Sequence, residues 1–334
     1  MRCAQRYWES SREHMSAING PIYLAPGLLG PIASTLADAA RGEVEHGALS
    51  QFLSRARYQP LAGTSTEALL AQLYPNAPAP GPLIAAAQGR TESAYYYRAA
   101  PVHLRADRDR LLLFAGQDLA LDDAEANAIA EAFNQVFNAD GLELCWRDGE
   151  GLMAAPTPPG PNLPGLFEVA GRYLDTVLPG EAASRPWRQL LNEVQMLLHE
   201  HPVNQARARR GALSVNGLWI WAGGPAAELT QTAEPAAGHP LVRGLQVSGQ
   251  RRAERSSQAP LTLWEAAAEA LMAGDIERWL AALQAFEQTL GDALAQHPSG
   301  MTLLPGNGYA YHLDRLAPWR FWRRADLRRH WLLQ

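Results

Sequence analysis

Lysine is absent from this 334-residue sequence, and all 29 of its basic residues are arginine. The arginine guanidinium stays protonated in proteins and does not form the Schiff bases that lysine amines form. The absence therefore excludes pyridoxal phosphate anchoring, the phosphate-loop lysine and the kinase lysine. We expect no cofactor, and composition alone indicates no reaction.

Cysteine is nearly absent as well. Only Cys3 and Cys145 occur, the first in a polar leader over residues 1–16 and the second in an expected buried strand. We therefore predict no disulfide between them and a reducing, cytoplasmic location. The leader lacks the apolar core of a signal peptide, and Met15 is an alternative natural start.

Long apolar runs and an excess of positive charge are also missing. No run approaches the ~18 residues of a membrane span, so we expect no membrane partner. The net charge of −5 and a pI near 6.0 disfavour nucleic acid as a partner. The sequence has no Gly-x-Ser-x-Gly, Gly-x-Gly-x-x-Gly, Walker or His-Glu-x-x-His motif. Its length suits about two domains.

The residues that are present predict an α+β fold with a central ferredoxin-like module at residues 101–224. Strand-sized apolar runs and helical stripes follow one another there in the order β-α-β-β-α-β. Asp122 and Asp123 are N-cap candidates for the first helix, and Asp148-Gly149 marks the turn between the two middle strands. The expected strands are 111–114, 142–146, 151–155 and 212–222, and the expected helices are 123–138 and 186–199.

The regions on either side of the module are expected to be mainly helical. Residues 17–100 are predicted to hold a short strand, three helices and a Pro-rich linker at 75–82. Residues 225–260 are typical of a surface connection. Residues 261–334 are predicted to contain a helical pair, a hairpin and a basic, Trp-rich tail. The flanking elements expected are strand 18–25, helices 33–40, 48–57, 66–73, 263–273 and 276–296, and hairpin strands 301–304 and 309–313.

The densest group of candidate binding residues follows the second helix of the module. The guanidinium of Arg207 could bind a carboxylate or phosphate in a bidentate manner, and the amides of Asn204 and Asn216 could fix polar edges of a ligand. The alternative is structural: the tryptophans belong to the core, the arginines are solvated and the asparagines cap turns. The ligand-binding hypothesis comprises His199, His201, Asn204, Arg207, Asn216, Trp219 and Trp221.

His199 and His201 also raise a metal hypothesis. Two histidines at this spacing just past a helix end can chelate, but zinc sites take three or four protein ligands. No cysteine pair, Asp-x-Asp motif or distant histidine in a ligand-like context completes the set, so a histidine that caps the helix C-terminus is favoured. We predict neither a metal site nor a catalytic residue in this group.

The C-terminal tail interleaves aromatic and basic residues. The run Trp319 to Arg324 alternates the two kinds, a pattern that could stack bases or contact an acidic surface. The alternative is a final helix that buries Trp319, Trp322 and Leu327. We expect a protein partner to be the best candidate for residues 315–334, since the acidic chain disfavours nucleic acid.

The run from Asn192 to Gly224 resembles two groups of proteins. One is the proteobacterial RpfE-type regulatory family, often labelled phosphoglycerate mutase, and this resemblance extends to residues 25–30, 101–104 and 319–324. The other is the archaeal-type cofactor-independent phosphoglycerate mutases, whose smaller domain has a similar Asn-x-x-Arg…Gly…Asn-x-x-Trp-x-Trp-x-Gly pattern. The residues that carry the resemblance are Asn192-Glu193-Val194-Gln195-Met196-Leu197-Leu198-His199, His201-Pro202-Val203-Asn204, Arg207, Gly211, Asn216 and Leu218-Trp219-Ile220-Trp221-Ala222-Gly223-Gly224.

The mutase resemblance implies metal chemistry from which this sequence departs. Those mutases hold two metal ions with Asp and His and form a phosphoenzyme on Ser. The resemblance implies Asp-Gly after the first strand, where this sequence has Pro26-Gly27, and a late Asp-His pair that is missing. Phosphoryl transfer depends on such charge neutralisation. We therefore predict a non-catalytic regulatory protein that binds a small anionic metabolite, phosphorylated or carboxylated. The alternative is a divergent, metal-dependent phosphate-handling enzyme.

Overall fold

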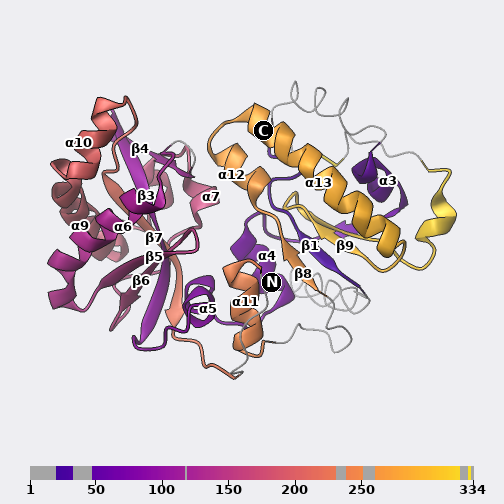
Figure 1. Cartoon of the computed structure of the whole chain (residues 1–334), viewed down its shortest axis with the longest axis horizontal. Coiled ribbons are helices and arrows are strands. Elements are labelled where there is room, and N and C mark those ends of the chain that lie inside the picture. Colours follow the sequence, from indigo (N-terminus) through magenta and orange to yellow (C-terminus); the bar gives the residue numbers. More distant parts are fainter. Residues whose placement is uncertain are drawn as a thin grey trace. The chain divides into compact units, whose positions relative to one another are not determined.

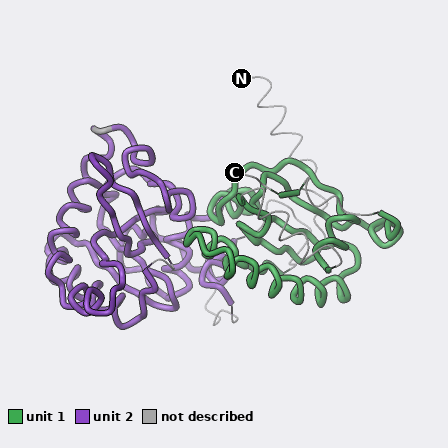
Figure 2. The backbone as a smooth tube through the Cα atoms, turned by 90° about the horizontal axis from the view of Figure 1, so that it is seen from above, with its two compact units in different colours: residues 1–75, 251–334 green, residues 76–250 purple. Residues whose placement is uncertain are grey.

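The computed structural model describes residues 20–32, 47–116, 119–230, 238–250, 260–323 and 330–331. The polar leader with Cys3 and the helix expected at 33–40 lie outside these residues. The chain forms two compact units (Figure 2): unit 1 comprises Met1–Pro75 and Arg251–Gln334, and unit 2 comprises Asn76–Gln250. Unit 1 is thus built from both ends of the chain, and the first boundary falls inside the predicted Pro-rich linker.

Unit 1 contains a five-stranded sheet in the order β2-β10-β9-β1-β8. Strand β1 (Ile22–Leu24) pairs in parallel with both β8 (Leu261–Leu263) and β9 (Thr302–Leu304). Strand β10 (Tyr309–His312) pairs antiparallel with β9, as the predicted hairpin requires, and antiparallel with β2 (Arg57–Pro60). Strands β1, β2, β8 and β9 therefore run in the same direction. The two flanking regions of the sequence come together as one α+β unit.

Two helices, α3 (Ala48–Arg55) and α13 (Ile276–Gln296), pack against this sheet (Figure 1). The apolar stripe of α13 is buried, and Trp279 donates its indole N–H to the carbonyl of Gly27 at 2.9 Å. The Asp275 carboxylate caps α13, and the helix has the predicted limits. The other helices in the described part of unit 1 are α4 (Thr66–Leu73), α12 (Ala266–Met272) and the 3-10 turn η3 (Ala317–Arg320).

The sheet of unit 2 is antiparallel and is organised around one long strand, β3 (Tyr95–Asp107). This strand pairs with β4 (Arg110–Ala115), β6 (Glu150–Ala155) and β7 (Gly217–Pro225). Strand β5 (Glu143–Arg147) forms a hairpin with β6. The predicted Asp-Gly turn is present between them, and both of its residues have positive φ, as such two-residue turns require.

Two helices, α6 (Asp123–Phe137) and α9 (Glu181–His199), share a core with this sheet. Helix α6 begins with a capping box in which the Asp122 carboxylate accepts from the amide of Glu125 at 2.8 Å. Of its predicted apolar stripe, Ile129, Phe133 and Phe137 are buried, whereas Val136 is 50% exposed. Short helices complete the connections: η2 (Asn138–Asp140), α7 (Leu166–Val169), α8 (Leu174–Val177) and α10 (Pro202–Arg209).

Helix α5 (Pro80–Ala87) packs against β3, β7 and α11 (Pro240–Val247). The two helices meet closely at Gly244, where a Cβ atom would lie 2.0 Å from the carbonyl oxygen of Leu83. A residue with a side chain could not occupy this position without moving one helix. None of the helices in the described part of the chain is long and apolar enough to cross a membrane.

The structure corrects several predicted elements. Sequence periodicity misses β3 because polar and proline residues interrupt its pattern, and it misses β8, which has only three residues. Helix α9 begins at Glu181 and contains Pro186, which the sequence analysis places at its start. No helix or strand is predicted at residues 202–209, which form α10, and α11 lies inside the expected surface connection.

Candidate functional site

Arg207, in the predicted ligand-binding group, is completely buried in unit 2. Its Nε donates to the carbonyl of Leu213 at 2.6 Å, and its Nη2 donates to the carbonyl of Leu119. Its Nη1 forms a 2.6 Å ion pair with Glu125 of α6, whose other oxygen pairs with Arg210 at 2.6 Å. All three guanidinium nitrogens thus have internal partners, and Arg207 connects α10 to α6.

The two predicted asparagines bind backbone groups. Asn204 donates to the carbonyls of Leu198 and Val215 at 2.7 and 2.6 Å and accepts from the amide of Val215 at 2.8 Å. Asn216 accepts from the amide of Leu104 at 2.6 Å and donates to its carbonyl at 2.9 Å. Each side-chain amide hydrogen-bonds to backbone groups next to the end of a helix or strand. This agrees with the alternative in which the asparagines have a structural role and bind no ligand.

The tryptophans and histidines of the group also have structural positions. Trp219 is fully buried and donates its indole N–H to the carbonyl of Pro164 at 3.0 Å. Trp221 is buried too. His199 is the exposed last residue of α9, whereas His201 caps the beginning of α10 by accepting from the amide of Val203 at 3.3 Å. The cap therefore serves the following helix, and not the C-terminus of α9 as expected.

The seven predicted residues therefore lie in one region of unit 2, around α10 and β7, but most of their polar atoms are already hydrogen-bonded. Burial lowers the pKa of His201, which keeps its ring neutral and able to accept the capping bond. Ligand binding by this group stays a prediction.

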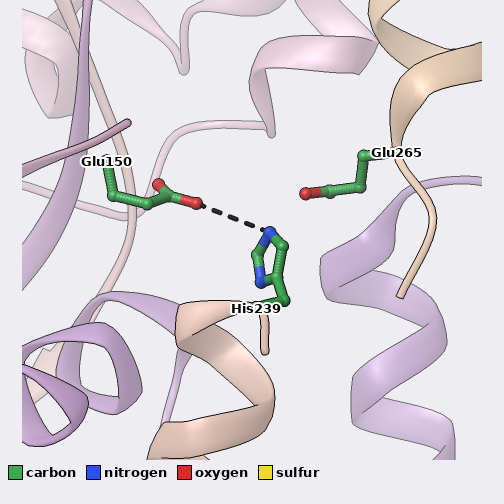
Figure 3. A group of neighbouring side chains, drawn as sticks. All are labelled: Glu150, His239 and Glu265. Atoms are coloured by element: carbon green, nitrogen blue, oxygen red, sulfur yellow. Dashed lines mark ion pairs between the residues drawn. The ribbon is translucent and has the colours of Figure 1, made fainter. Parts of the chain in front are cut away.

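Arg98, Glu150 and His239 form a charged group in unit 2 that the sequence analysis does not identify. Arg98 of β3 places its Nη2 3.0 Å from both carboxylate oxygens of Glu150, and its guanidinium lies 4.9 Å from the ring centre of Trp221. The Nε2 atom of His239 lies 3.8 Å from Glu150 Oε1 (Figure 3). Only recognition of β3 as a strand could have suggested this group.

A pocket of about 530 Å³ also lies in unit 2, beside α6 and β5. Its lining includes Arg90, which pairs with Glu143 at 2.8 Å, and the half-buried Cys145. Burial raises the pKa of the Cys145 thiol, so the thiol stays protonated at neutral pH. The buried Oε1 of Gln88 has no hydrogen-bond partner. The pocket is polar, and its lining contains both arginines and glutamates.

Unit 1 offers a different kind of site, where its parallel strands end. Strands β1, β2, β8 and β9 run in one direction, so the segments that follow them begin at the same edge of the sheet. We call this set the carboxyl edge; it comprises residues 25–30, 61–66, 264–265 and 305–308. Open sheets with parallel strands bind their ligands outside such ends.

Contacts show that these segments converge. Gly306 has a φ of +73°, and a Cβ atom there would lie 2.6 Å from the carbonyl oxygen of Thr64 and 3.3 Å from the Cα of Pro26. Three segments therefore meet at a position that only glycine fits. The hydroxyl of Thr66 donates to the carboxylate of Glu265, which adds the fourth segment.

The polar side chains of this edge include three consecutive hydroxyl groups, and a helix begins there. The buried Ser65 caps α4 by accepting from the amide of Ala68, and Thr64 is half-buried beside it. Asn307 is buried and donates to Tyr311 and to the carbonyl of His330 at 2.9 and 2.7 Å. The four segments contain one carboxylate, Glu265, and no histidine. By themselves they therefore do not fit the two-metal centre that the mutase resemblance implies.

Comparison with known proteins identifies a distant sequence relative. No protein-family model matches the chain. A probable 2,3-bisphosphoglycerate-independent phosphoglycerate mutase of Geobacter sulfurreducens is 25% identical over 149 residues, which cover 41% of this chain and 35% of the relative. The chain thus matches about a third of that protein's length. The match indicates weak homology to cofactor-independent phosphoglycerate mutases; membership of the RpfE-type family stays a prediction.

Two solved structures are similar at low identity. The cofactor-independent phosphoglycerate mutase from Thermoplasma acidophilum has a TM-score of 0.36 and 14% identity, with 89% of this chain and 90% of that chain covered. The PH0037 protein from Pyrococcus horikoshii has a TM-score of 0.44 and 12% identity, with 88% and 87% covered.

Proposed function

We propose that this chain binds a small phosphorylated or carboxylated metabolite at the carboxyl edge of unit 1 and acts as a regulatory protein. The observation that carries the proposal is the convergence of four parallel-strand ends, with Thr64, Ser65 and Thr66 among them. The N-terminus of α4 lies there, and its partial positive charge favours an anion.

Two further considerations support parts of this proposal. The distant similarity to phosphoglycerate mutases favours a phosphorylated compound over other metabolites. The regulatory role rests on the resemblance to RpfE-type proteins. Arg207 is completely buried and engaged with Glu125 and backbone carbonyls, whereas Thr64 is half-buried, so the carboxyl edge is a better place for the ligand than the group around α10.

Thermal unfolding with a panel of compounds tests the proposal. The panel contains inorganic phosphate, 2- and 3-phosphoglycerate, phosphoenolpyruvate and citrate. A ligand at 100 times its Kd adds about 2.7 kcal/mol of stability, which raises the Tm visibly. We expect at least one compound to do so and Thr64→Val, which removes a hydroxyl and keeps the shape, to reduce the shift.

Arg90→Gln is the matched control, because it removes a cation from the pocket of unit 2 and leaves the carboxyl edge intact. A shift that disappears in Arg90→Gln but persists in Thr64→Val would move the binding site to that pocket. No shift with any compound would contradict the proposal as a whole.

The second candidate function is a divergent phosphate-handling enzyme, and the hydrogen bond from Thr66 to Glu265 favours it. A hydroxyl that donates to a carboxylate has the geometry of a nucleophile beside its base. This alternative predicts metal-dependent turnover of phosphoglycerate, which added Mn²⁺ supports and Glu265→Gln abolishes. For a binding protein, Glu265→Gln instead removes a negative charge near the anion, and we expect equal or tighter binding.

A further inference from the structure

Four large apolar side chains are exposed within seven residues of unit 1, on and beside the 3-10 turn η3. Leu316 is 56% exposed, Trp319 69%, Phe321 72% and Trp322 66%. Single exposed apolar residues are normal on soluble proteins, but a contiguous group of this kind marks an interaction site. We call residues 315–323 the aromatic segment.

The fold holds the aromatic segment in this exposed position. Arg320 is buried, donates to the carbonyl of Arg55 at 2.6 Å and binds both carboxylate oxygens of Asp314 at 2.8 and 2.6 Å. Asp314 also pairs with Arg57 at 2.8 Å, and Ala317 is fully buried. The sequence alternative of a helix that buries Trp319 and Trp322 is therefore wrong, because Arg320 and Ala317 occupy the inward positions instead.

The exposed charges of the aromatic segment have one sign. Arg315 and Arg323 are exposed, and residues 315–323 include no acidic residue. The neighbouring carboxylate of Asp314 is already bound to two arginines. The segment is therefore a cationic, aromatic surface on a chain whose net charge is −5. The charge of the segment, and not the net charge of the chain, selects its partner, which must be anionic.

We propose that the aromatic segment docks unit 1 onto an anionic lipid surface. Trp and Phe side chains partition into the boundary between lipid headgroups and acyl chains, and arginines beside them bind the anionic headgroups. This contact is peripheral and needs no membrane span, so the proposal departs from the sequence expectation of no membrane partner, which depended only on the lack of a spanning segment.

The exposed fractions favour lipid over a protein partner. Each of the three aromatic rings is about two-thirds exposed or more, so the rings project from the surface as separate anchors. Phe321 and Trp322 contact one another edge to face with centroids 5.4 Å apart, and their other faces remain exposed. A fluid lipid boundary can surround such anchors, whereas a protein surface needs preformed pockets for each.

Flotation of the full-length protein with lipid vesicles tests this proposal. We expect the chain to float with phosphatidylglycerol–phosphatidylcholine vesicles and not with pure phosphatidylcholine vesicles, and to detach at high salt. The triple change Trp319→Ser, Phe321→Ser and Trp322→Ser should weaken binding at least tenfold. Arg323→Gln should weaken it about fivefold, the effect typical of one cation near an anionic membrane.

Two controls match these variants elsewhere on the chain. Met196→Ser removes a side chain that is 78% exposed on unit 2, and Arg185→Gln removes an exposed cation from α9; neither should change flotation. Because the altered side chains are exposed, all variants should unfold at the wild-type Tm.

Failure to float, equal flotation of the triple variant or equal binding to pure phosphatidylcholine would overturn the proposal. Binding to polyglutamate without binding to vesicles would overturn it as well, in favour of an acidic protein partner.

Discussion

At the scale of single residues, the ion pair between Arg207 and Glu125 is the contact whose loss should cost unit 2 the most. Arg207→Ala leaves the carbonyls of Leu119 and Leu213 without their partner. It also removes one of the two arginines that pair with the buried Glu125 carboxylate. Breaking a buried pair in this way typically costs about 3–5 kcal/mol. Urea unfolding measures the loss, and Arg209→Ala, at an exposed position of the same helix, should change it by less than about 0.5 kcal/mol. A loss below about 1 kcal/mol for Arg207→Ala would contradict this expectation.

His312 of β10 is the residue from which we expect a pH dependence of stability. Burial lowers its pKa from 6.5 to about 4, and its buried Nε2 has no hydrogen-bond partner. The unfolded chain therefore binds more protons than the folded chain between these values, so stability present above pH 6.5 is lost as the pH falls toward 4. The shift corresponds to at most about 3 kcal/mol.

Denaturant unfolding between pH 7 and 4 checks this prediction. In His312→Gln the fall in stability over this range should be smaller than in the wild type by about that amount. Parallel curves for the two proteins would show that His312 does not titrate with a lowered pKa.

At the scale of elements, two glycines in helices should respond to the same substitution with opposite signs. In Gly244→Ala the added Cβ would lie 2.0 Å from the carbonyl oxygen of Leu83, so α11 and α5 must separate and stability should fall by about 1–3 kcal/mol. In Gly291→Ala, inside α13, the Cβ would lie 3.8 Å from that of Ala48, an ordinary contact. Alanine is the better helix former, so stability should rise by about 0.5–1 kcal/mol. Thermal unfolding measures the stability of the two variants. A change in Tm of the same sign in both would show that the space around the added Cβ does not decide the effect.

The elements that sequence reasoning locates well are those with local signals. Helices α4 and α13 have the predicted limits because Ser65 and Asp275 cap them, and the β5–β6 turn follows from Asp148-Gly149. Strands with three residues, such as β8, give too little pattern. The role of Arg207 was also beyond local reasoning, because its partners Glu125 and Leu119 lie in segments far from it in the sequence.

At the scale of the whole molecule, the two units differ in how the chain supplies them. Unit 2 is one continuous segment with its own sheet and core. We expect residues 76–250, produced alone, to unfold cooperatively with urea and to show dispersed amide resonances. Residues 251–334 alone lack β1 and β2 and should not fold. A disordered 76–250 fragment would show that unit 2 depends on the rest of the chain.

The position of β1 between β8 and β9 also orders events during synthesis. Residues 22–24 leave the ribosome before unit 2, but their two neighbours in the sheet, residues 261–263 and 302–304, are made only after it. Unit 2 can therefore fold cotranslationally, while the first strand waits with its apolar residues unpaired. The nascent chain thus exposes an unpaired apolar strand while all of unit 2 is synthesised, and the dependence of its yield on chaperones should follow from this interval rather than from the stability of the finished protein.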